Sequence, residues 1–222
     1  MKKICLFLIA LCLCTALHAQ QATELRRSKT VFTYPEFKVA KVNQSFGRFV
    51  KDTINIFLKD ASLVFKHDDK VYKANVDNIL GLEVDSVKYR KVGNQMARVI
   101  AQKGVNMLLC VTTVDLDVLG EETHGPVSQG FFDLDIPNLG GTSASGLLDF
   151  SGHEREEDEG YPLKDKYYFL IKGEPVVANE SQIKKYVRPD MKTAWKNLMA
   201  DRFWSWNDAQ SLTQVLIYLP ER

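Results

Sequence analysis

Two closely spaced pairs of aspartates are the strongest candidates for chemistry in this chain of 222 residues. One residue separates Asp115 from Asp117, and one separates Asp133 from Asp135. If both runs are extended, the carboxylates of each pair lie on one face of a strand, because strand side chains alternate between faces. Four such carboxylates repel one another unless they bind a hard cation such as calcium, which takes about six to eight oxygen ligands. The pattern predicts a metal site, in either a calcium-stabilised module or a metal-assisted hydrolase.

A solvated acidic face is the competing interpretation of these aspartates, and it is the one that we favour. The second pair does not match the calcium loop of helix-loop-helix proteins. Pro137 and Asn138 stand where that loop needs a further ligand and an obligatory glycine.

Other motifs fall short of a catalytic set. Residues 153–157 lack the second histidine of a zinc-protease helix, because Glu157 occupies its position. Residues 141–146 lack the glycine and serine spacing of a serine-hydrolase nucleophile elbow. The apolar neighbours of Cys110 predict a buried, inert thiol. We therefore predict no catalytic residue, and no cofactor apart from the calcium considered above.

Tryptophans near the C-terminus are candidates for partner binding. Trp204 and Trp206 fall in a predicted break between two helices, where a half-exposed tryptophan can anchor a protein or stack on a sugar. Alternatively, they form a hydrophobic plug that pins the helices to the sheet, and we favour this interpretation. Trp195 fits the apolar stripe of a helix and is predicted to be core.

The N-terminal segment is typical of a secretory signal peptide. Lys2 and Lys3 precede an apolar run over residues 4–17, too short for a membrane-spanning helix, which needs roughly 20 residues. We expect residues 1–19 to be removed after Ala19, which leaves 203 of the 222 residues as a periplasmic or secreted protein without a transmembrane segment. Lipid attachment is disfavoured because leucine, not a small residue, precedes both Cys12 and Cys14.

Cleavage at this point would also remove three of the four cysteines. Cys5, Cys12 and Cys14 lie in the leader, and the remaining Cys110 cannot form an internal disulfide. The fold must therefore be held by its apolar core, which is feasible because a chain of this length can bury roughly 70% of its unfolded surface.

Charge is segregated along the chain. Residues 20–114 hold 16 Lys and Arg against 9 Asp and Glu, residues 115–165 hold 2 against 13, and residues 166–222 hold 9 against 6. Because the middle segment is also rich in glycine, we predict a long acidic loop insertion over about 119–165. The slightly acidic mature chain argues against nucleic acid as a partner. Segregated charge favours steered association with another macromolecule.

Short apolar runs predict an antiparallel sheet. Short apolar runs lie at 54–58, 61–65, 82–89, 96–100 and 106–118, and polar turns are predicted at 66–70, 85–86 and 91–95. Such connections join antiparallel strands, since parallel neighbours need crossovers of about a dozen residues or more. Residues 131–136 predict another strand, which Pro137 ends, and residues 166–177 a last hairpin. We expect the sheet to run from about Val39 to Val177.

The apolar period changes from strand-like to helix-like after this hairpin. Helices are expected over 181–187, around Trp195 and after Asn207-Asp208, either of which can cap a helix. The fold class is therefore α+β, with a β-rich domain over 20–178 and two to three helices over 179–222 packed on the same domain.

Four short segments precede the helical pair, at residues 59–65, 81–85, 89–92 and 167–173. In the order of these segments, the chain resembles uncharacterised exported proteins of Gram-negative bacteria. The resemblance implies an envelope location, a β-strand body and a short lysine-rich helical tail, and it supplies no catalytic residues. Together these patterns predict a non-enzymatic envelope or secreted protein that binds another macromolecule.

The leader gives a direct prediction. N-terminal sequencing of the protein purified from its native cells should begin at Gln20, because cleavage after Ala19 removes the basic and apolar regions together. A cytosolic protein that still begins at Met1 would contradict export.

Overall fold

The computed structural model describes residues 25–68, 70–122, 147–148 and 160–221. Twelve strands are defined in these residues. They are β1 (Arg27–Ser28), β2 (Lys38–Gln44), β3 (Phe49–Phe57), β4 (Ser62–His67), β5 (Lys70–Lys73), β6 (Ile79–Val84), β7 (Val87–Val92), β8 (Gln95–Lys103), β9 (Asn106–Val114), β10 (Leu147–Leu148), β11 (Tyr161–Ile171) and β12 (Glu174–Val177). The α-helices are α2 (Leu116–Glu122), α3 (Glu180–Ile183), α4 (Lys192–Ala200) and α5 (Ala209–Val215).

Every strand pair within the described residues is antiparallel, which confirms the predicted sheet. The strand order is β1-β11-β9-β8-β7-β6-β2-β3-β4-β5-β10, with β12 paired to β11. Turns of two residues join β6 to β7, β7 to β8 and β8 to β9. Asp85, Gly93 and Gly104 in these turns have positive φ angles, as tight hairpins require.

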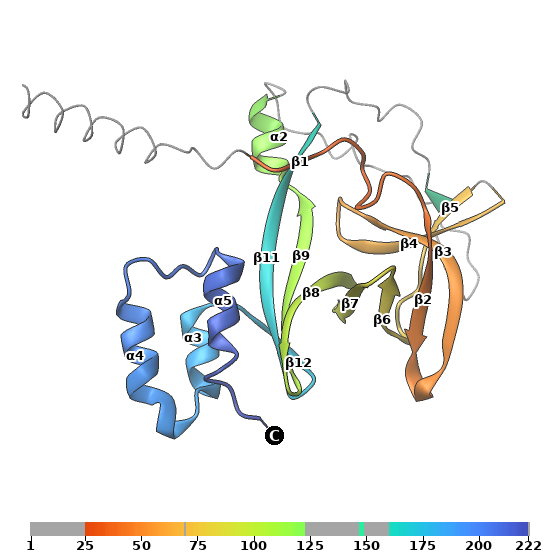
Figure 1. Ribbon diagram of the computed structural model, residues 1–222. Coiled ribbons are helices and arrows are strands. Elements are labelled where there is room, and N and C mark those ends of the chain that lie inside the picture. Colours follow the sequence, from red (N-terminus) through yellow and green to blue (C-terminus); the bar gives the residue numbers. More distant parts are fainter. Residues whose placement is uncertain (1–24, 69, 123–146, 149–159, 222) are drawn as a thin grey trace, which may run out of the picture.

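The sheet curls into a half-barrel (Figure 1). The end of β3 thereby reaches the end of β9, although four strands separate them in the sheet order. The amide of Val114 donates to the carbonyl oxygen of Leu58 at 2.8 Å, and the amide of Met96 donates to that of Ala61 at 2.8 Å. These bonds fix the curl, because each satisfies backbone groups that the strand ladder leaves unpaired.

Apolar side chains of the described residues form three clusters, one within the curled sheet, one beneath the helices and a smaller one around Leu58, Val114 and Tyr161. The first cluster includes Ile54, Ile56, Leu82 and Met96. In the second, strands supply Leu108, Phe169 and Ile171, and helices and following turns supply Ile183, Trp195, Leu212, Val215, Leu216 and Leu219. Figure 1 shows α3, α4 and α5 together on one side of β9 and β11. The C-terminal helices therefore bury their apolar faces against the sheet.

Local chemistry explains the helix boundaries. The side chains of Asn179 and Asp208 accept hydrogen bonds from the backbone amides of Gln182 and Ser211, so each caps the helix that follows. The expected helix over 181–187 is a short α3 that continues into a 3-10 turn at Lys184–Tyr186. No helix among the described residues has the length and apolar content needed to cross a membrane.

Two sequence predictions differ from the structure. The strand expected over 106–118 ends at Val114, because Asp115 accepts backbone hydrogen bonds from Asp117 and Val118 at the start of α2. Of the acidic loop expected over about 119–165, residues 119–122 belong to α2 and residues 161–165 to β11, while 123–146 and 149–159 lie outside the described residues. The strand predicted over 131–136 lies outside the described residues.

Gly81 provides a test of the packing within the sheet. A Cβ atom at this position would overlap the carbonyl oxygen of Tyr89 on β7, which is backbone and cannot move aside cheaply. Gly81→Ala should therefore lower the free energy of unfolding by about 1–3 kcal/mol, measured by urea denaturation. Leu80→Ala is the matched control, because Leu80 is half exposed and should change the midpoint little. Equal midpoints for the two variants would refute this close approach.

Candidate functional site

A cavity of about 290 Å³ lies between the segment before β2 and the strands of the half-barrel. Strands β3, β7, β8, β9 and β11 all contribute to its wall. Its apolar lining comes from Ile56, Leu58, Val87, Met96 and Leu163. Because these residues are far apart in the chain, the cavity exists only when the sheet has curled. We call it the half-barrel pocket.

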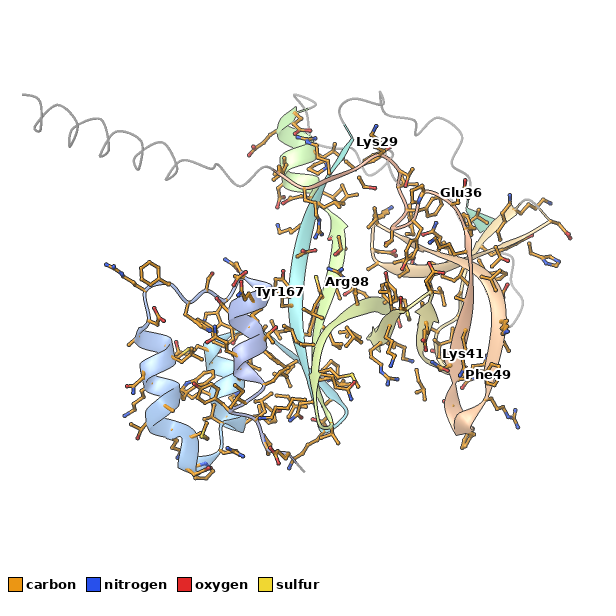
Figure 2. The ribbon with its side chains drawn as sticks, viewed as in Figure 1. Lys29, Glu36, Lys41, Phe49, Arg98 and Tyr167 are labelled. Atoms are coloured by element: carbon orange, nitrogen blue, oxygen red, sulfur yellow. The ribbon has the colours of Figure 1, made fainter. Side chains whose placement is uncertain are left out.

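A row of polar side chains crosses four strands beside this pocket. Tyr89 on β7 pairs with Arg98 on β8, Arg98 pairs with Cys110 on β9, and Cys110 pairs with Tyr167 on β11. Residues directly opposite one another on neighbouring strands share a face of the sheet, so the four side chains form one row. Figure 2 labels two members of the row, Arg98 beside β9 and Tyr167 beside β11.

Two tyrosines meet at one end of the row. The hydroxyl oxygens of Tyr34 and Tyr89 lie 2.7 Å apart, and either can be the donor. Burial, followed by the hydrogen bond to Tyr34, raises the pKa of Tyr89 well above its ordinary value. Tyr89 therefore stays a neutral phenol at physiological pH. The pair has one hydroxyl proton that it does not use internally.

Tyr34 is held in place by a buried amide. The Asn55 side chain, on β3, donates to the carbonyl oxygen of Tyr34 at 2.8 Å and accepts from its backbone amide at 3.1 Å. Asn55 is completely buried. The segment that carries Tyr34 is thus attached to β3 almost as another strand would be.

Arg26 and Thr112, which line the pocket, belong to a second polar cluster. The hydroxyl of Thr112 and the guanidinium of Arg26 each donate to one carboxylate oxygen of Asp165, at 2.6 Å in both cases. Burial alone would raise the pKa of Asp165, but the hydrogen bonds from Thr112 and Arg26 outweigh it and lower the pKa. Asp165 is therefore ionised, and its charge is compensated by Arg26.

Arg98 differs from Arg26 in having no such partner. No hydrogen bond or ion pair joins Arg98 to another residue within the described ranges. Its side chain is exposed and lines the pocket between Tyr89 and Cys110. An exposed guanidinium at an apolar cavity is suited to hold a carboxylate or phosphate, with which it can form paired hydrogen bonds.

Cys110 does not add a nucleophile to this pocket. The residue is 2% exposed, which confirms the prediction of a buried thiol. Burial, and then the negative charge of Asp165, raise the pKa of Cys110 to about 12. The thiol is therefore protonated at neutral pH, whereas nucleophilic attack needs the thiolate.

The structure describes one of the two aspartate pairs that were predicted as a metal site. Asp115 and Asp117 do not share a strand face, since Asp115 caps α2 and Asp117 lies in its first turn. The ammonium of Lys164 lies 3.8 Å from Asp115 and 3.3 Å from Asp117. Asp133 and Asp135 lie outside the described residues. Within the described part of the chain no three His, Cys, Asp or Glu side chains form a group that could hold a metal ion, and calcium binding stays a prediction.

The predicted partner-binding tryptophans are half-buried among the helices. Trp204 and Trp206 contact each other with ring centroids 4.7 Å apart, and Trp206 lies 6.2 Å from Trp195. The indole of Trp204 donates to the carbonyl oxygen of Ser211 at 3.1 Å. Phe203, in the same loop, is 80% exposed and is therefore more accessible to a partner than either tryptophan.

A larger groove of about 470 Å³ lies on the helical segment. Lys184, Lys192 and Lys196 surround it, and Trp195 and Met199 give it an apolar wall. All of its lining comes from one local stretch, residues 180–200. The half-barrel pocket is the stronger candidate site, because it joins six separate chain segments and contains an arginine, Arg98, with no ion-pair partner among the described residues.

Comparisons with protein-family models, curated protein sequences and solved structures found no match. The resemblance to exported proteins of Gram-negative bacteria accordingly stays a prediction.

The environment of Cys110 predicts slow thiol chemistry. At pH 8 a thiol-specific reagent should modify the folded chain from Gln20 onward much more slowly than the same chain in urea, because the folded thiol is protonated and shielded. The pKa of this thiol is 9.0 in the unfolded chain and about 12 in the folded chain, so the folded state holds the proton more tightly. The contribution of the thiol to the free energy of unfolding is therefore fully present below pH 9 and is lost as the pH rises toward 12. Equal labelling rates in both states would exclude a buried, protonated thiol.

Proposed function

We propose that this protein is a non-enzymatic binding protein whose half-barrel pocket holds a small molecule with an apolar body and one anionic group. The observation that carries the proposal is Arg98, a cation that lines an apolar cavity without a carboxylate partner in the described part of the chain. A bound anion would supply the missing charge.

The pocket's size and lining limit the ligand. Its volume, about 290 Å³, is at the lower end of the range of roughly 300–1,000 Å³ that is usual for ligand sites. Five aliphatic or methionine side chains would cover the ligand body, and burial of apolar surface is favourable by about 25 cal/mol per Å². A short acyl chain or a single ring with a carboxylate has this combination of size and polarity.

The polar groups around Arg98 support binding of an anion rather than a cation. Arg26 compensates Asp165, so the net charge left at the pocket is that of Arg98. The Tyr34 and Tyr89 hydroxyls share one hydrogen bond, which leaves one hydroxyl proton for an acceptor on the ligand. Both tyrosines line the same pocket as Arg98.

Protonation states of the buried groups favour binding over catalysis. Cys110 and Tyr89 have raised pKa values and are neutral at pH 7, so neither is prepared as a nucleophile or base. Export to the envelope or the exterior is part of the proposal, and its support is the leader-like segment at residues 1–19. A binding protein in that compartment needs no disulfide, since its core is apolar.

Isothermal titration calorimetry with octanoate and octanol tests the role of Arg98. These probes share the apolar body, and only octanoate carries an anion. Octanoate should bind more tightly than octanol, and Arg98→Gln should weaken octanoate roughly tenfold or more, because a charge-assisted hydrogen bond is lost. Octanol binding should be unchanged in this variant.

Lys88→Gln is the matched control for charge. Lys88 is an exposed cation on β7 next to Tyr89, and neighbours on a strand point to opposite faces, so it lies away from the polar row. The variant should bind octanoate as the unaltered protein does. Octanoate binding that does not respond to Arg98→Gln, or that responds equally to Lys88→Gln, would refute the proposed anion site.

A further inference from the structure

The end of the β2–β3 hairpin exposes an unusual amount of apolar surface. Phe46 is 97% exposed, Phe49 54% and Val50 43%. All residues from 46 to 52 are exposed. Figure 1 shows that this hairpin extends to one end of the molecule and finishes beyond the neighbouring strand β6. An exposed apolar group of this kind marks an interaction site more often than a single exposed side chain does.

Phe46 is held in a strained backbone conformation. Its φ of 61° and ψ of 30° lie in the left-handed region, which is unfavourable for a bulky side chain by about 1 kcal/mol or more. The ring gains almost no burial in return, since it is nearly fully exposed. Strain without an internal benefit suggests an external role for the side chain.

Cations stand directly behind these apolar residues. Lys41 on β2 pairs with Lys51 on β3, although like charges directly opposite each other destabilise a sheet. The ammonium of Lys41 lies 4.7 Å from the ring centroid of Phe49, and both residues are labelled in Figure 2. No ion pair joins Lys41, Lys51 or Arg48 to a carboxylate within the residues that the structure describes.

We propose that the end of this hairpin inserts into the surface of an anionic lipid bilayer. Lys41 and Lys51 are two residues further from the turn than Phe49, which is roughly 7 Å along a strand. Amphipathic segments bury their apolar groups about 5–10 Å into the headgroup region. With Phe46 and Phe49 at that depth, the two lysines reach the level of the lipid phosphates.

The shape of the hairpin end favours a lipid surface over a folded acidic protein. It is a convex tip whose most exposed ring stands at the turn, and neither pocket includes its residues. A fluid headgroup layer can adapt to such a tip without a preformed partner cavity. The inference goes beyond the proposed ligand-binding function and uses none of the residues of the half-barrel pocket.

Vesicle cosedimentation of the full chain tests this inference. The chain should bind vesicles of phosphatidylglycerol and phosphatidylcholine more tightly than vesicles of phosphatidylcholine alone, and high salt should weaken the difference. Replacing both Lys41 and Lys51 with Gln should reduce binding to the anionic vesicles roughly 30-fold, and Phe46→Ser should reduce it about tenfold or more. Every variant carries the same N-terminal segment, so the differences report on the hairpin.

Matched variants and a second anionic target serve as controls. Phe203→Ser alters an exposed phenylalanine beside a cation elsewhere, and Lys192→Gln with Lys196→Gln removes two cations from α4. Both should bind vesicles like the unaltered chain, and unfolding midpoints should confirm that every variant is folded. The proposal is overturned if the hairpin variants bind vesicles normally or if the α4 variant shows the larger loss of binding. Polyglutamate is the second anionic target. Loss of binding to polyglutamate alone in the hairpin variants would also overturn the proposal, because it would indicate an acidic protein partner.

Discussion

The buried side-chain amide of Asn55 is the interaction on which the half-barrel pocket depends. Its oxygen accepts from the backbone amides of Tyr34 and Ile56, and its nitrogen donates to the carbonyl oxygens of Tyr34 and Glu36. Leaving any of these groups buried without a partner costs about 1–3 kcal/mol, so the four bonds specify one path for the segment before β2. That path places the Tyr34 hydroxyl against Tyr89 and closes one wall of the pocket. The hydrogen bonds that satisfy the buried amide of Asn55 therefore also fix the geometry of the pocket.

Two polar groups with different charge compensation determine the electrostatics of the pocket. Asp165 is compensated by Arg26 and Thr112, whereas Arg98 has no counterion among the described residues. In the proposed function, a pocket with one compensated carboxylate and one guanidinium free of a described partner favours a negatively charged ligand without carrying a large net charge. The hairpin end differs, because Lys41 lies opposite a second cation, Lys51 on β3, as well as opposite Glu83 on β6. One region thus suits a single small anion, and the other suits an extended anionic surface.

The sequence predicts those features that depend on neighbouring residues. The polar turn predicted at 91–95 indicates an antiparallel hairpin, and Asn207-Asp208 indicates a helix start, because both signals act within a few positions. The period-two pattern of residues 114–118 misleads, since Val114, Leu116 and Val118 alternate as in a strand while the Asp115 side chain caps a helix. The pocket could not be predicted in this way. Arg26 meets Asp165 across 139 positions, and Asn55 looks like any polar residue between two isoleucines.

Strand β11 serves both halves of the molecule. Its N-terminal half places Leu163 at the pocket and Asp165 beside it, and its C-terminal half packs Phe169 and Ile171 beneath the helices. A one-residue insertion or deletion between these halves would turn one set of side chains to the wrong face. Evolution can lengthen the loops of such a protein freely, but the spacing within β11 cannot drift. Lineages that inherit this fold should carry that interval unchanged even where every residue in it has been replaced.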